Sequence, residues 1–166
     1  NPEVQKIATE KVKEWIQAAP NADIFSVSQE DNEGGACQCE ECLKVLAEEG
    51  EESGALLRFV NVVAAEIAKE HPDVKIETLA YNYSEAPPKK VRPLPNVRVR
   101  LCVPWSDRAH PLDAPSNTRT YDLVDGWSKM TDHLYIWDYD TEYNDLLMIH
   151  PTRNYVKTAY KIFQEK

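Results

Sequence analysis

The sequence predicts an α/β fold made of parallel βα units, resembling part of a TIM (β/α)8 barrel. Two observations support this class. Short β-branched segments alternate with segments of helical periodicity, and successive strands lie too far apart in the chain for hairpin turns. About four such units fit into this chain, whereas a complete barrel typically needs about 250 residues. We expect residues 1–166 to form a single domain, a fragment of a larger barrel protein, with a small open α/β sheet as the alternative.

The first half of the chain contains two predicted helices around one strand. Asn1, followed by proline, has the pattern of a helix cap, and the helix after it is predicted to end before Pro20. The short apolar segment 24–28 is predicted to be the first strand. Ser53 is predicted to cap the second helix, whose apolar residues recur on one side until the chain reaches His71.

The second half of the chain supplies three more strands and two more helices. Segments 75–83, 97–103 and 134–139 are predicted to be strands two to four. Helical spacing of apolar residues predicts helices near 123–130 and 153–164. Because the connections are long enough for crossovers, we expect the four strands to lie parallel and in sequential order.

Composition and charge argue against nucleic-acid binding and against a membrane span. The net charge of −9 argues against nucleic acid, because the chain has no basic stripe to displace the counterions of phosphates. The sequence also has no apolar run long enough to cross a bilayer, so we expect no membrane span.

Acidic residues follow predicted strands one and four. In a parallel sheet these strand ends lie at one edge, which is where ligands bind. Cleavage of a glycosidic bond needs two carboxyl groups, one to protonate the leaving oxygen and one to activate water or attack the sugar. Asp31 and Asp138 are the preferred catalytic pair. Glu30, Asp140 and Glu142 are the substitutes, although acidic loops are also common as plain solvated surface.

Aromatic residues and a histidine gather at the same predicted edge. Aromatic rings can stack against sugar faces, but they are also common in the cores of sheets. Strand alternation predicts that half of these rings serve the core. The candidate substrate-binding residues are Tyr81, Tyr83, Trp105, His110, Trp137 and Tyr139.

Three of the four cysteines form the sequence C-x-C-x2-C. Cys37, Cys39 and Cys42 follow strand one, and we expect Cys102, at the end of strand three, to lie close to them. Four thiolates suit a tetrahedral structural zinc ion, with His110 as an alternative fourth ligand. A disulfide between Cys102 and either Cys37 or Cys39, or a set of free thiols, remains open.

Five sequence blocks carry a family resemblance. In order along the chain they are SVSQEDNEGGACQCEEC, SGALLRFVN, TLAYNYSEAPP, NVRVRLC with AHPL shortly after it, and LYIWDY. Together they resemble the bacterial family known as domain of unknown function 4838. That family is similar to glycoside hydrolases with a TIM-barrel catalytic domain, such as the α-glucuronidases and hexosaminidases. By position, the family's acids match Asp31 and Asp138, and its cysteine motif matches Cys37, Cys39 and Cys42.

The resemblance implies that the chain belongs to a larger, exported protein, periplasmic or at the cell surface, that degrades polysaccharides. Its expected function is that of a glycoside hydrolase segment acting on a polysaccharide or a uronic-acid-containing glycan through paired carboxylates. The alternative is a non-catalytic module that binds carbohydrate or is stabilised by zinc. Expected partners are carbohydrate and the remainder of the parent protein. Self-association is also expected, because a half-barrel leaves apolar edges exposed.

Overall fold

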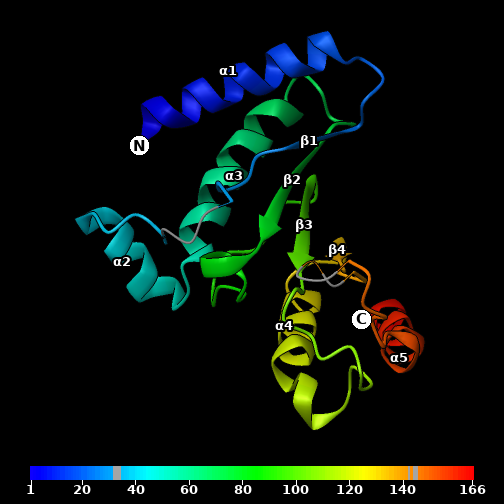
Figure 1. The fold of residues 1–166 in the computed structure, drawn as a ribbon. Helices are drawn as coiled ribbons and strands as arrows, with labels where there is room; N and C mark the ends of the chain where they lie inside the picture. Colours follow the sequence, from blue (N-terminus) through cyan, green and yellow to red (C-terminus); the bar gives the residue numbers. More distant parts are fainter. Residues whose placement is uncertain (32–34, 142, 144–145) are drawn as a thin grey trace.

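The computed structural model of the chain describes residues 1–31, 35–141, 143 and 146–166. Figure 1 shows an α/β fold in which one sheet is flanked by helices. The elements in chain order are α1 (Pro2–Ala18), β1 (Ile24–Ser26), α2 (Glu40–Glu49), α3 (Ser53–Ala68), β2 (Lys75–Ala80), the short 3-10 helix η1 (Asn82–Ser84), β3 (Val97–Cys102), the short 3-10 helix η2 (Pro115–Asn117), α4 (Thr118–Ser128), β4 (Leu134–Trp137) and α5 (Arg153–Glu165).

The four strands form one parallel sheet in the order β1-β2-β3-β4. This confirms the predicted topology and is consistent with part of a TIM-like βα fold. Each strand is shorter than predicted, ending one to three residues earlier. All four carboxyl ends therefore lie at one edge of the sheet, as parallel strands require.

The two faces of the sheet have different chemistry. One face, the helix-covered face, carries Val97, Val99 and Leu101 of β3, which are fully buried in the core with residues of α3 and α4. The opposite face, called the open face, carries Arg100 and Trp137, and Trp137 is 46% exposed. This alternation follows from the strand period of two residues, which turns successive side chains to opposite faces.

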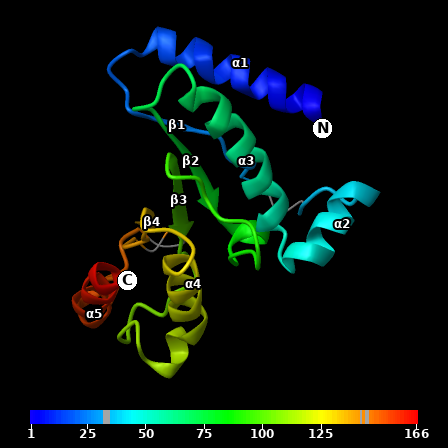
Figure 2. The ribbon, with the colours of Figure 1, turned by 180° about the vertical axis from the view of Figure 1, so that it is seen from behind.

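The amino-terminal helix begins as its sequence predicts. The Asn1 side chain accepts a hydrogen bond from the Glu3 backbone N–H at 2.9 Å, and Pro2 occupies the first turn. Val12 and Ile16 of α1 are buried in the core. Both views of the ribbon show α1 lying along α3, and they place the two chain ends far apart (Figures 1 and 2).

Three details of the predicted elements were wrong. Helix α2 was not predicted, because the cysteine sequence before it was interpreted as one continuous loop. Ser53 does not cap α3: its hydroxyl donates to the Ala86 carbonyl at 2.5 Å, and Glu52 is the N-cap residue. Strand β2 ends at Ala80 because the chain then turns into η1, where Asn82 has a φ of 50°.

A buried carboxylate fastens the proline-rich crossing between β2 and β3 to the helices. Glu49 is fully buried at the end of α2, and its Oε2 accepts the backbone N–H groups of Lys90 at 2.8 Å and Val91 at 3.0 Å. Its Oε1 forms an ion pair with Arg58 of α3. Two neighbouring backbone N–H groups of the crossing and one arginine of α3 thus meet at a single side chain.

Candidate functional site

Five of the predicted site residues come together at the carboxyl ends of the strands. Cys102 of β3 and Trp137 of β4 are register partners in adjacent strands. The Tyr139 hydroxyl hydrogen-bonds with the Cys102 thiol, and Tyr139 also interacts electrostatically with Tyr81 and Asp31. We call Asp31, Tyr81, Cys102, Trp137 and Tyr139 the strand-end cluster.

Burial sets the protonation of two members of this cluster. Burial raises the pKa of the Cys102 thiol to about 11, although the hydrogen bond with Tyr139 and the charge of Arg100 oppose the rise. Burial also raises the pKa of Tyr139 well above its usual range, and Cys102, Tyr81 and Asp31 add to the rise. Both groups are therefore neutral at pH 7 and act as hydrogen-bonding groups.

An ion pair on the open face supports the same cluster. Arg100 donates to Glu77 at 2.5 Å, and its guanidinium carbon lies 5.4 Å from the centre of the Trp137 ring. The Arg100 Nε is buried and has no hydrogen-bond partner among the described atoms. Arg100 and Glu77 were missed as candidates, although the alternation of VRVRLC turns Arg100 and Cys102 to one face.

Asp138 directly follows β4 on the helix-covered side and is engaged in a buried ion pair. Its Oδ1 accepts from Arg108, whose side chain is 3% exposed, from the Tyr139 backbone N–H at 3.0 Å, and from the Tyr155 hydroxyl at 3.5 Å. The Arg108 guanidinium packs on the Tyr155 ring at 4.2 Å. Asp31 is exposed, so the two carboxylates of the preferred catalytic pair have different surroundings.

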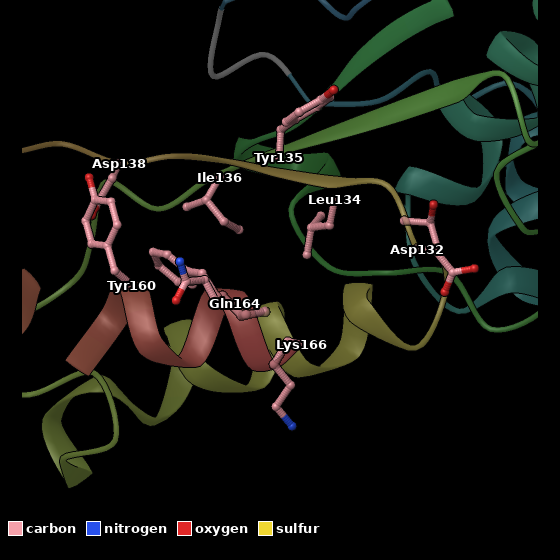
Figure 3. A pocket seen from close by; sticks show the side chains of 11 residues that line it. Asp132, Leu134, Tyr135, Ile136, Asp138, Tyr160, Gln164 and Lys166 are labelled. Atoms are coloured by element: carbon pink, nitrogen blue, oxygen red, sulfur yellow. The ribbon is translucent and has the colours of Figure 1, made fainter. Parts of the chain in front are cut away.

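A pocket of about 450 Å³ runs along β4 on this helix-covered side. Figure 3 shows Leu134 and Ile136 directed toward α5, Tyr135 directed to the opposite side, and Asp138 beside the Tyr160 ring. The Asp138 Oδ2 is buried and lacks a hydrogen-bond partner among the described residues. The pocket therefore follows the edge strand β4 on the helix-covered side. Trp137 of the strand-end cluster lies on the open face instead.

The three substitute carboxylates have different positions. Glu30 is exposed, and its charge acts on Tyr83. Asp140 is exposed beyond β4. Glu142 lies outside the described residues. Tyr83 belongs to η1 rather than to a strand, and it lines a pocket together with Cys37 and Cys42.

Trp105 and His110 occupy the loop after β3. Trp105 is 68% exposed. The His110 Nδ1 lies 2.7 Å from the Asp107 Oδ2, and the His110 side chain is 62% exposed. Hydrogen bonds from Ser116 and His110 lower the pKa of Asp107. This arrangement fixes one nitrogen of the His110 ring and leaves His110 apart from the cysteines.

The three cysteines of the C-x-C-x2-C sequence converge at the beginning of α2. The sulfur atoms of Cys37, Cys39 and Cys42 lie within 4.8 Å of one another, so the three could hold a metal ion. Cys39 is the N-cap residue of α2, and the backbone N–H of Cys42 and the other two thiols lower the pKa of Cys39. The contact with Cys39 raises the pKa of Cys42 to about 11.

Cys102 is not a member of this thiol group among the described residues. It is 3% exposed and bonds with Tyr139 instead, and all four cysteines are free. A pocket of about 200 Å³ adjoins the thiols and is lined by Cys37, Cys42, Leu46, Leu56, Phe59 and Tyr83, among others. The helix that carries Cys42 is what draws the three sulfurs together.

Within the described residues, none of the helices combines the length and apolarity needed to span a membrane.

Comparison with known proteins places the chain in a family. No curated protein and no solved structure matches the chain. The family model described as "Domain of unknown function (DUF4838)" matches residues 1–166. The chain therefore belongs to the DUF4838 family.

Proposed function

We propose that this chain binds carbohydrate at the strand-end cluster, as part of a barrel that hydrolyses glycosidic bonds in a polysaccharide or uronic-acid-containing glycan. The observation that carries the proposal is the meeting of aromatic rings with an exposed carboxylate at the carboxyl ends of four parallel strands. That edge is where βα folds assemble their ligand sites.

The chemistry of the cluster suits a sugar ring. Trp137 presents a half-exposed ring on which a sugar face can stack, while Arg100 supports it at 5.4 Å. The Nε of Arg100 is buried and lacks a partner among the described atoms, so it is not a donor that a ligand on the Trp137 ring would reach. Glu77 already pairs with the charge of Arg100, so the expectation of a uronic acid rests on the family resemblance rather than on a free positive charge at the ring.

Asp31 is the acid that we assign to this site. It is exposed, and its charge acts on both Cys102 and Tyr139. Asp138, which bonds with Arg108, is better suited to holding the loop after β3 in place than to transferring a proton. The second carboxyl group required for hydrolysis then comes from a residue other than Asp138.

Replacement of Trp137 by Ala tests the binding site directly. We expect the variant to lose about fivefold or more in affinity for a uronic-acid oligosaccharide, because a stacked ring contributes about 1 kcal/mol or more. Isothermal titration calorimetry would measure the change. Trp15→Ala is the matched control, since Trp15 is similarly exposed at 43% but lies on α1. Equal affinities for the Trp137 variant and the unmodified chain would contradict the site.

We also propose that the three thiols bind zinc and thereby stabilise the beginning of α2. The support is the donor set, because three sulfur atoms within 4.8 Å of one another suit an ion that forms bonds of about 2.3 Å to thiolates. Elemental analysis of the reduced chain should find about one zinc per molecule. A chelator should lower the melting temperature by about 5 °C or more, because metal binding is linked to folding.

Cys39→Ser is the variant that separates zinc from other causes of stability. It should lose the metal and make the melting temperature insensitive to the chelator, because one of the three ligands is gone. A metal-free protein in which Cys37, Cys39 and Cys42 all react with a thiol reagent in the folded state would contradict zinc binding.

A further inference from the structure

We infer that the thiol site has three ligands among the described residues and one open position, which takes an external thiol with an apolar body from the adjoining pocket. This inference rests on the proposed metal binding and specifies the ligand class of the same site. It departs from the expectation of a closed four-cysteine site, which a purely structural zinc would favour.

Three protein ligands are available to the ion among the described residues. Among the described histidine, cysteine, aspartate and glutamate side chains, the group at this position consists of Cys37, Cys39 and Cys42. Cys102 is buried against Tyr139, and His110 bonds with Asp107. Zinc and cobalt sites with three protein ligands complete their tetrahedron with water or an external ligand.

The ion would be accessible both from solvent and from the adjoining pocket. Cys37 and Cys39 are exposed and Cys42 is half-buried, so the site lies at the protein surface. Cys37 and Cys42 also form one side of the 200 Å³ pocket. A ligand in that pocket would lie next to two of the three sulfur atoms. The remaining pocket wall includes Leu46, Leu56 and Phe59, which suit an apolar body.

The net charge around the proposed ion is negative. Three thiolates around a divalent ion leave one net negative charge, and Glu52 at the same pocket adds another. Lys44 does not compensate, because its ammonium group already pairs with Glu40 at 2.9 Å and Glu41 at 3.0 Å. The site therefore disfavours a ligand whose body carries a carboxylate.

Sulfur is the donor atom that best suits the open position. An ion already bound to three sulfur atoms favours a soft fourth donor over a hard carboxylate oxygen. When the external thiol binds, it releases its proton to solvent and its sulfur replaces water on the ion. The valences of the metal and of all sulfur atoms stay the same, so this exchange needs no oxidant or reductant.

Cobalt(II) spectroscopy of the reduced chain tests the number of protein ligands. Cys102→Ala should leave the sulfur-to-cobalt absorption unchanged, whereas Cys39→Ser should abolish it. A decrease of about a quarter in the Cys102 variant would show a closed four-thiolate site and overturn the open position while leaving metal binding in place. Failure of the unmodified chain to bind cobalt would overturn both proposals. Melting curves would establish that each variant is folded.

The ligand itself is tested with two thiols of similar size added to the cobalt-loaded chain. We expect 2-phenylethanethiol to change the visible spectrum at a concentration at least about tenfold lower than mercaptosuccinate, for the reasons of polarity and charge given above. Leu46→Gln, which makes the pocket wall polar, should remove most of that difference. An unchanged spectrum with both thiols, or equal potency of the two, would overturn the inference.

Discussion

Asp31→Asn is expected to reduce the turnover of glycoside substrates by about 100-fold or more in the protein that contains this chain. The amide keeps the size of the side chain and removes its ability to exchange a proton. Because Asp31 is exposed, the substitution should leave the melting temperature nearly unchanged. Turnover of aryl glycosides and of uronic-acid oligosaccharides would be measured with the two proteins side by side.

A matched control exists at the opposite edge of the sheet. Asp73 is likewise exposed, but it precedes β2 and so lies at the amino ends of the strands. Asp73→Asn should leave turnover unchanged. If Asp31→Asn retained full turnover, the acid would have to be another group, and the role assigned to Asp31 would be wrong.

Glu49→Ala is expected to lower the free energy of unfolding by about 3 kcal/mol, the largest effect on stability that we predict. The substitution leaves the backbone N–H groups of Lys90 and Val91 without their acceptor and Arg58 without its buried partner. Denaturant unfolding would measure the change. Glu48→Ala is the control, because Glu48 pairs with the same arginine at 2.7 Å but is 53% exposed, and its loss should change stability by less than about 0.5 kcal/mol.

The pH dependence of stability gives a second test of Glu49. Burial opposes its charged form most strongly, but the hydrogen bonds from Val91, Arg58 and Lys90 together outweigh burial and lower the pKa of Glu49. A carboxyl group with a lowered pKa stabilises the fold above its unfolded pKa of about 4.3, and that stabilisation is lost as the pH falls. Glu49→Gln should therefore lose less stability than the unmodified chain between pH 7 and pH 3. Identical losses would contradict this role.

The parallel sheet could be predicted from sequence because its signal is local and repeated. Each strand is a short β-branched run, and each crossover is too long for a hairpin. Helix α2 was missed because its first turn, Glu40 and Glu41, lacks an apolar face, and Cys39 at its N-cap forms no side-chain cap hydrogen bond. The end of β2 was missed because the chain leaves the strand direction through a single residue, Asn82, which takes the left-handed conformation. The pattern of apolar residues along a strand does not indicate such a residue.

The site was harder to predict because it depends on which face of a strand each residue occupies. Asp138 and Tyr139 are adjacent in sequence, yet Asp138 bonds with Arg108 on the helix-covered side while Tyr139 bonds with Cys102. Sequence placed both at the correct strand end without separating them. Likewise, Cys102 was expected beside the other cysteines because both segments leave one edge, but its direction from β3 takes it to the strand-end cluster.

The most direct test of carbohydrate binding at the strand-end cluster is a nuclear magnetic resonance titration of the isotope-labelled chain with a uronic-acid oligosaccharide. We predict shifts of the Trp137 indole signal and of the backbone amides of Asp31, Tyr81 and Tyr139, with the signals of α1 and of residues 71–74 unchanged. Shifts confined to α1 or to the amino ends of the strands, or no shifts at millimolar ligand, would contradict the account.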